Sequence, residues 1–292
     1  MQGRYSFPPR VNGAGCAIRY VDSGIIPFLQ FPRLAASDGI RHAVTTRMGG
    51  VSTGYLAELN LSFSRGDAEE NVRENFRRVS ILFGAPEDRF VFSDQTHTAN
   101  VRVVTEADAG KGLTRRRDYT DTDGLVTDVP GLVLSIFTAD CVPVLFFDPV
   151  RHAIGLSHSG WRGTVSRIGA ETIRLMKEQY GTEPADLKCA IGPSICQDCY
   201  EVSEDVAGEF AAGFAGHEQE ILLPKGGGKY QLDLWEANRI VLTDAGVLPE
   251  NIEVTDVCTC CNPDLLFSHR ATQGKRGNLG TFLMLEKPEK HE

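Results

Sequence analysis

Apolar residues in this chain occur both in short continuous runs and at helical spacing. Four segments have the spacing of amphipathic helices: Glu69–Phe83, Val165–Tyr180, Glu204–Phe214 and Trp235–Ala245. Six segments have the apolar, β-branched character of strands: Ile40–Thr46, Phe90–Ser93, Val101–Thr105, Leu132–Phe137, Val142–Phe147 and Ala153–Ser157. Three strand-like runs fall between residues 123 and 157 with no helix among them, so the order is not a regular βαβ repeat. The pattern predicts an α+β fold with mixed or antiparallel sheets.

The chain shows no internal repeat and no long linker, so we expect its 292 residues to form one domain. The glycine cluster at residues 226–228 predicts a mobile loop. No apolar run approaches the roughly 18–20 residues of a membrane span, and the N-terminus lacks the apolar core of a secretory signal. With 39 acidic and 30 basic residues the net charge is −9, which disfavours general nucleic-acid binding. Neither a membrane nor a nucleic acid is therefore an expected partner.

Eight cysteines lie at positions 16, 141, 189, 196, 199, 258, 260 and 261. In a chain of this size without an export signal, we expect a reducing, cytoplasmic environment. Free thiols or metal ligands are then more plausible than disulfides.

The richest candidate chemistry lies around Cys141 and His158. Cys141 opens one predicted strand and His158 closes the next, so a hairpin through residues 149–151 brings the two side chains together. His97 follows another predicted strand and completes a set of two histidines and one cysteine. Such a set suits Zn²⁺ and leaves a fourth position for water. One zinc per chain is the stoichiometry that we expect from this set.

The spacing of these three residues leaves other interpretations open. They can be a buried thiol and two hydrogen-bonded histidines of the core. They can also form a metal-free hydrolase in which Cys141 is the nucleophile and His158 the base. In a third, non-enzymatic interpretation the zinc is structural and the protein is a binding module. A structural site needs four protein ligands, which distinguishes it from an open catalytic site.

Two glycine-containing turns are candidate anion sites. The turn Ser159–Gly163 can present backbone N–H groups, and Arg162 can add a positive charge. Arg47 precedes Gly49 and Gly50 at a predicted strand end and can bind phosphate. A capped strand-to-helix turn and an ordinary surface ion pair are the structural alternatives.

The remaining cysteines allow a second metal site. Cys196 and Cys199 have the spacing of a zinc knuckle, but the adjacent pair Cys260 and Cys261 does not fit the usual second knuckle. From the spacing we therefore expect these cysteines to be reduced thiols.

Several motifs occur together in one order along the chain: Thr46–Ser52, Leu59-Asn60-Leu61, Gly66-Asp67, Asp94–His97, Thr122-Asp123-Gly124, Ala139–Pro143, His158–Gly163, Ile191-Gly192-Pro193, Cys199–Val202, Cys258-Thr259 and Phe267–Arg270. By these motifs the chain resembles the YfiH-like or laccase-domain family, whose members are described as polyphenol oxidases and as purine nucleoside phosphorylases. The match covers about residues 35–286 of the single domain 1–292, with residues 1–34 as an N-terminal decoration.

The resemblance implies a mixed α/β layered sandwich and a zinc held by His97, Cys141 and His158. It implies phosphorolysis of adenosine, inosine and methylthioadenosine to the free base and a ribose 1-phosphate, together with adenosine deamination. Purine nucleosides and phosphate are then the small-molecule partners. Copper-dependent polyphenol oxidation, with Cu²⁺ as cofactor, is also attributed to the family. The sequence lacks the His-x-His repeats of a trinuclear copper cluster.

By the same resemblance, the catalytic set is His97, Cys141, His158 and Asp140, and the substrate-binding set is Arg47, Asn60, Gln95, Gly160 and Arg162. Asp94 and Asp140 are each candidates for moving a proton or for orienting a ligating histidine. The chain departs from the family pattern at residues 195–199 and 273–277. We expect these two stretches to affect the far wall of the pocket and the substrate preference.

Overall fold

The computed structural model describes residues 18–286, so Cys16 and the first part of the predicted N-terminal decoration lie outside the described residues. The first sheet has six strands, in the spatial order β1 (Arg19–Asp22), β2 (Pro27–Gln30), β3 (Ile40–Thr45), β15 (Leu279–Leu285), β7 (Val133–Thr138) and β4 (Phe90–Phe92). Its pairs are antiparallel except β4 with β7. Strands β1 and β2, which fall in the predicted N-terminal decoration, therefore extend this sheet at its edge.

The second sheet also has six strands, in the order β14 (Ile252–Val254), β10 (Lys188–Ile191), β8 (Val142–Asp148), β9 (Ala153–Ser159), β6 (Gly124–Thr127) and β5 (Val101–Val103). Here β10 and β14 are parallel, as are β5 and β6, and the other pairs are antiparallel. A small antiparallel sheet contains β11 (Glu201–Ser203), β13 (Lys229–Leu232) and β12 (Leu222–Gly226). Of the three glycines predicted to form a mobile loop, Gly226 ends β12, and Gly227 and Gly228 make the turn between β12 and β13.

The helices are α1 (Pro32–Ala35), α2 (Glu69–Phe83), α3 (Trp161–Val165), α4 (Ile168–Tyr180), α5 (Glu204–Gly213), α6 (Glu218–Ile221), α7 (Leu234–Asp244) and α8 (His269–Thr272). Helix α2 has the predicted bounds, and it ends at Gly84, whose φ of 59° is left-handed. The helix predicted from Val165 is instead divided, because Arg167 between α3 and α4 also has a left-handed backbone. No helix in residues 18–286 combines the length and apolar character needed to cross a membrane.

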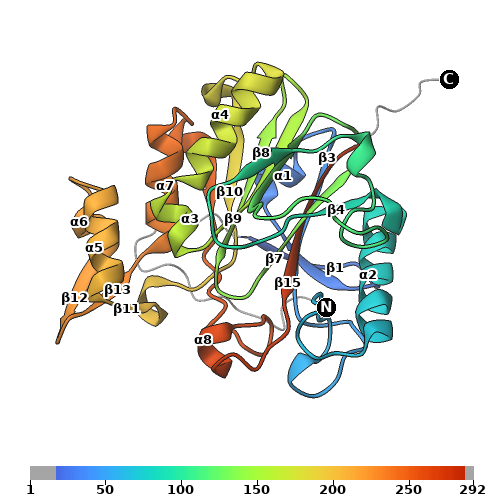
Figure 1. Cartoon of the computed structure of the whole chain (residues 1–292), viewed down its shortest axis with the longest axis horizontal. Helices are drawn as coiled ribbons and strands as arrows, with labels where there is room; N and C mark the ends of the chain where they lie inside the picture. Colours follow the sequence, from blue (N-terminus) through green and yellow to red (C-terminus); the bar gives the residue numbers. More distant parts are fainter. Residues whose placement is uncertain (1–17, 287–292) are drawn as a thin grey trace.

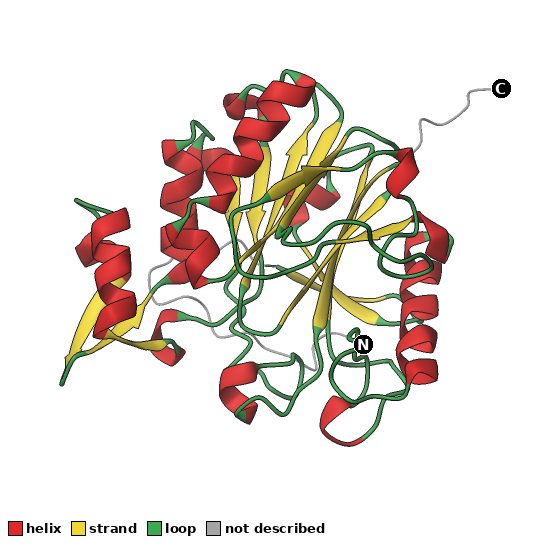
Figure 2. Ribbon diagram, in the orientation of Figure 1, coloured by secondary structure: helices red, strands yellow, loops and turns green. Residues whose placement is uncertain are grey.

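The elements stack in layers, with α2 on one side of the two large sheets and α4 and α7 on the other (Figure 1). Figure 2 shows the strands gathered between these helices. In β8, Val144 and Phe146 face the core shared with α4 and α7, whereas Leu145 and Phe147 face the core between the sheets. A strand buried on both faces reads as a continuous apolar run. The predicted α+β fold with mixed sheets is confirmed.

The predicted hairpin is also present and positions the candidate chemistry. Strands β8 and β9 pair antiparallel, with Val142 opposite Ser159 and Pro143 opposite His158. Cys141, immediately before β8, is therefore brought to the end of β9.

Candidate active site

His97, Cys141 and His158 come together as the sequence predicted. Their ligand atoms all lie within 4.8 Å of one another, and the two imidazole centroids are 4.9 Å apart. His158 is buried, Cys141 is partly buried and His97 is exposed. One side of the set is thus embedded in the sheet, and the other is accessible from solvent.

Asp123, just before β6, holds both histidines in place. Its Oδ1 lies 2.7 Å from Nδ1 of His158, so Nε2 of that ring is left for another partner. The same fully buried carboxylate accepts hydrogen bonds from the backbone N–H groups of Thr96, His97 and Thr98, at 3.0, 3.1 and 2.9 Å. These bonds fix the loop in which His97 adopts a left-handed φ of 68°.

The electrostatics of this set favour a thiolate. Burial raises the pKa of Cys141, but His158 and His97 outweigh burial and lower that pKa to about 6. Burial lowers the pKa of His158, but Cys141 and Asp123 outweigh it and raise this pKa to about 9. Burial likewise raises the pKa of Asp123, yet the hydrogen bond from His158 and those from the backbone lower it to about 2. A metal ion that takes the place of the proton on His158 would therefore find Cys141 already present as a thiolate.

Gly160 leaves open the space beside the three side chains. A Cβ at this position would lie 3.1 Å from Cδ2 of His97, 3.2 Å from Sγ of Cys141 and 3.7 Å from Cε1 of His158. Its φ of −67° suits any residue, so the backbone conformation does not require glycine. A side chain at this position would instead crowd His97 and Cys141, and glycine keeps the space beside them free.

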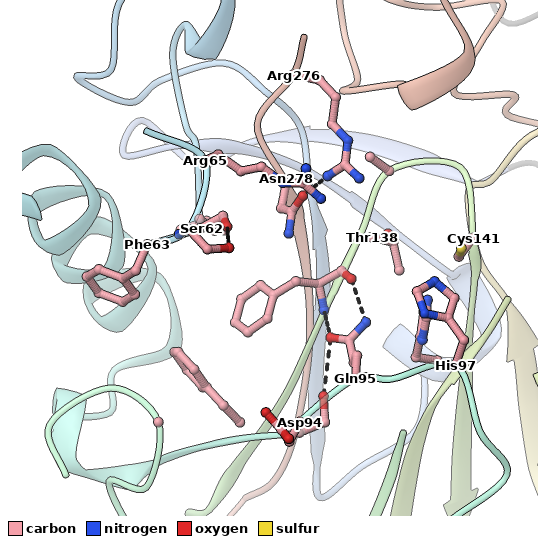
Figure 3. A pocket seen from close by; sticks show the side chains of 18 of the residues that line it. Ser62, Phe63, Arg65, Asp94, Gln95, His97, Thr138, Cys141, Arg276 and Asn278 are labelled. Carbon is pink, nitrogen blue, oxygen red and sulfur yellow. Dashed lines mark hydrogen bonds between the residues drawn. The ribbon is translucent and has the colours of Figure 1, made fainter. Parts of the chain in front are cut away.

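The set lies at the edge of a cavity of about 480 Å³ (Figure 3). Aromatic side chains on its walls are Phe63, Phe92 and Phe137, and its polar residues include Ser62, Ser64, Arg65, Asp94, Gln95, Arg117, Thr138, Arg276 and Asn278. The cavity therefore joins an apolar surface suited to a flat ring with a polar, basic wall.

Arg65 and Arg276 give that wall its positive charge. Arg276 is largely buried, and burial together with Arg65 lowers its pKa to about 10. The Nε atoms of both arginines are buried without a hydrogen-bond partner, and no carboxylate within residues 18–286 forms an ion pair with either. Two neighbouring guanidinium groups without an ion-pair partner give this wall a positive charge that can attract an anion such as phosphate.

Comparison with known proteins identifies the family of this chain. Residues 41–286 match the model of the family described as multi-copper polyphenol oxidoreductase laccase. The chain belongs to this family, which is the predicted YfiH-like, laccase-domain family.

Curated relatives in this laccase-domain family are named purine nucleoside phosphorylases. The protein YlmD of Bacillus subtilis strain 168 is 38% identical over 248 residues, which cover 82% of this chain and 86% of YlmD. A purine nucleoside phosphorylase of Deinococcus radiodurans is 39% identical over 264 residues, covering 90% of this chain and 95% of the relative.

Solved structures show the same fold. YlmD from Geobacillus stearothermophilus matches with a TM-score of 0.85 and 33% identity, over 92% of this chain and 99% of that one. The hypothetical protein YfiH of Bacillus licheniformis matches with a TM-score of 0.86 and 34% identity, over 91% and 99% of the two chains. The layered sandwich with mixed sheets is thus shared.

The other residues predicted for the site occupy varied positions in this family member. Gln95 lies in the cavity, where its amide bonds both N–H and C=O of Phe137, each at 2.7 Å. Asp140 has a left-handed φ of 92° and accepts from Oγ1 of Thr259 and from the N–H of Arg270, at 2.6 and 2.7 Å. Asp140 therefore joins two loops and does not contact a ligating histidine through its carboxylate.

Arg162 is exposed and stacks on Trp161, with its guanidinium carbon 4.3 Å from the ring centroid. Asp94 lines the cavity but forms an ion pair with Arg117 at 2.6 Å. The charge of Asp94 is therefore already paired, and the guanidinium of Arg162 is held against the indole ring.

Arg47 and Asn60 do not line the cavity. Arg47 donates to the carbonyl groups of Ala57 and Pro263, both at 2.7 Å, and stacks over Phe267. Asn60 is fully buried and bonds backbone groups around it. Both hold loops at the periphery of the site together. Arg47 does so through backbone carbonyl groups and not through the ion pair that was its structural alternative.

Sequence reasoning did not assign roles to Asp123, Arg65 or Arg276. The sequence did indicate Asp123, because this residue is at the centre of the family motif Thr122-Asp123-Gly124. Arg276 falls in a stretch that departs from the family pattern, where a different pocket wall was expected. Arg65 had no signal, because its charge has meaning only next to Arg276, more than 200 positions away in the sequence.

Proposed function

We propose that this protein is a zinc-dependent purine nucleoside phosphorylase that cleaves adenosine, inosine and methylthioadenosine to the free base and a ribose 1-phosphate. The observation that supports it best is one cavity that joins the His97, Cys141 and His158 set to the arginines Arg65 and Arg276. The names of the relatives agree with the proposal.

The ligand set fits zinc in its donors and its spacing. Two imidazoles and one thiolate are usual zinc ligands, and three protein ligands leave one position open. Within residues 18–286 this is the one candidate metal-binding group that contains histidine. The described residues therefore do not provide the several histidine-rich sites that a multi-copper enzyme needs. Zinc at this position would supply a Lewis acid that polarises a bound substrate atom.

The chain's own residues bind and orient the two substrates. Arg65 and Arg276 bind phosphate oxygens by charge-assisted hydrogen bonds. The aromatic walls Phe92 and Phe137 contact the purine ring. A phosphate oxygen then bonds to the ribose C1′ as the bond from C1′ to the purine nitrogen breaks. The purine leaves with the bonding electron pair and takes up a proton from solvent.

Adenosine deamination is a second reaction that we propose for this cavity, with water in place of phosphate. It yields inosine and ammonia and needs no anion at Arg65 and Arg276. The two reactions therefore separate when phosphate is withheld. Polyphenol oxidation with Cu²⁺ remains a side activity to be assayed with copper-loaded protein.

The alternative is a metal-free hydrolase, and one observation favours it. Cys141, His158 and Asp123 follow one another by close contacts, as nucleophile, base and orienting carboxylate do in cysteine hydrolases. In such an enzyme His97 has no essential role, whereas zinc binding requires it.

Turnover of inosine and adenosine before chelation, after it and after zinc is restored decides between the two. We expect activity to disappear with the metal, to return with zinc, and to release ribose 1-phosphate only when phosphate is present. Cys141→Ser and His97→Ala should both lose zinc and activity. Full activity in verified metal-free protein, with little effect of His97→Ala, would establish the hydrolase instead.

A further inference from the structure

Four cysteines outside the active site converge on one point. Cys196 and Cys199 lie in the segment after β10, and Cys258 and Cys261 lie in the segment after β14. Because β10 and β14 are parallel neighbours, the two segments leave the sheet at the same edge. They stay together, since the N–H of Thr259 donates to the carbonyl of Ser194 at 3.0 Å.

The distances between the four sulfur atoms suit a single metal ion. Sγ of Cys261 lies 3.4 Å from Sγ of Cys199 and 4.0 Å from Sγ of Cys196, and all four Sγ atoms lie within 4.8 Å of one another. Thiolates at about 2.3 Å from a tetrahedral zinc are roughly 3.8 Å apart. A disulfide needs about 2.05 Å, so these sulfur atoms are close without being bonded.

Backbone amides already point at one of the sulfur atoms. The N–H groups of Cys196 and Cys261 donate to Sγ of Cys258, at 3.2 and 3.4 Å. Hydrogen bonds of this kind stabilise a thiolate and orient it toward a metal. They are made within the two loops and do not depend on any residue of the active site.

The structure also resolves the spacing that argued against a second site. The second pair is Cys258 with Cys261, not the adjacent pair Cys260 and Cys261, so both pairs have the Cys-x-x-Cys spacing of zinc knuckles. Cys260 lies outside the converging set. Our expectation of one zinc rested on one good ligand set and on the poor spacing of the other cysteines, and this convergence removes the second reason.

We propose that Cys196, Cys199, Cys258 and Cys261 bind a second, structural zinc ion. Four protein thiolates fill the tetrahedral shell and leave no position for water or substrate, unlike the open His97, Cys141 and His158 set. The two metals therefore have different roles, and the second one holds together two loops that are distant in sequence.

These loops contact Asp140, the residue before Cys141. The N–H of Ile195 donates to the carbonyl of Asp140 at 3.0 Å, and Thr259 donates to its carboxylate at 2.6 Å. Nη1 of Arg270 also donates to the carbonyl of Cys199 at 3.0 Å. Losing the second metal should therefore loosen the loops around Asp140 as well as lower the thermal stability.

Metal analysis of the purified full-length chain and three variants tests the proposal. We expect about two zinc per chain in the wild type and about one in Cys141→Ser and in Cys199→Ser/Cys261→Ser. Cys260→Ser is the matched control, because it removes a neighbouring thiol that is not a ligand, and it should keep both. After cobalt substitution, the thiolate-to-cobalt absorption should stay strong in Cys141→Ser, which keeps four thiolate ligands. It should fall in the double variant to the weaker absorption of the one remaining thiolate ligand, Cys141.

A second measurement on the wild type does not require the double variant to fold. Titration of the folded wild type with a thiol-binding mercurial should release two zinc ions, one as Cys141 reacts and one as the four converging thiols react, with a metal indicator reporting the release. Folded Cys141→Ser should release only the second zinc. The proposal is overturned if the double variant keeps the wild-type zinc content, if the site contains iron, or if the four thiols react without releasing metal. A disulfide among these cysteines in freshly purified protein would also overturn it. None of these readouts depends on nucleoside turnover.

Discussion

At the residue scale, two arginines with the same charge have different surroundings. Arg276 is buried in the cavity wall beside Arg65 and lacks an ion-pair partner in the described chain. Arg47 is partly buried and donates to two backbone carbonyls of separate loops. The first arrangement suits a ligand, and the second suits the fold.

Exchanging each of these arginines for glutamine should therefore affect different properties. We expect Arg276→Gln to raise the KM for phosphate about ten- to a hundred-fold, because a charge-assisted hydrogen bond contributes roughly 1.5–3 kcal/mol. Arg47→Gln should lower the thermal midpoint while leaving that KM nearly unchanged. Steady-state kinetics at varied phosphate, with thermal unfolding of both variants, checks this. The reverse pattern would return Arg47 to the substrate-binding role predicted from the sequence.

Asp123 positions both histidines of the ligand set, one through its ring and one through its loop. Asp123→Asn removes the negative charge that favours a donor at Nδ1 of His158, and should weaken zinc binding at the active site about 10- to 100-fold. The second zinc should be unaffected. Competition with a metal indicator gives the affinities, and equal loss of both metals would mean that the variant is simply unfolded.

The types of the individual residues indicated the ligand set, but they did not indicate which carboxylate holds the two histidines in place. His97, Cys141 and His158 could be proposed because a soft thiol and two imidazoles suit few chemistries. Asp140 was an equally good carboxylate by sequence, and only the position of Asp123 under the His97 loop distinguishes the two. Such a difference depends on contacts between residues that are distant in the chain.

At the element scale, the turn from β9 into α3 determines access to the ligand set. Gly160→Ala places a methyl group against His97 and Cys141, at 3.1 and 3.2 Å. We expect weaker zinc binding and lower kcat with an almost unchanged thermal midpoint, since the backbone conformation suits alanine. Gly208→Ala in α5 is the control, because a Cβ there meets no atom within 4 Å. Equal zinc affinity in both variants would contradict the close approach.

Local sequence patterns predicted the elements whose burial produces a recognisable apolar pattern within the element itself. Helix α2 was found with its bounds because it has one apolar face and ends at a glycine. Strands β8 and β9 were found because both of their faces are buried. Strand β15 was missed, although it lies at the centre of the first sheet between β3 and β7. Its partners are more than 140 positions away in the sequence, so its place is fixed by tertiary contacts.

At the scale of the whole molecule, the first sheet contains a histidine that must stay neutral. His42 in β3 is 1% exposed. Its Nε2 accepts the N–H of Phe31 at 2.9 Å, and its Nδ1 has no partner. Burial lowers the pKa of His42 to about 4, from 6.5 in an exposed chain. Below pH 6.5 the unfolded chain therefore binds a proton that the folded protein does not, and stability falls until the pH reaches about 4.

The free energy of unfolding should accordingly decrease as the pH falls from 7.5 to 5, by about 2 kcal/mol from this residue alone. His42→Gln removes the titrating group, so the variant should lose less stability over this interval than the wild type, whatever its stability at pH 7.5. His152→Asn, at an exposed turn, should keep the wild-type pH dependence. Urea denaturation at fixed metal content across this pH range measures all three proteins. Parallel curves for the wild type and His42→Gln would show that His42 gains its proton without opening the sheet.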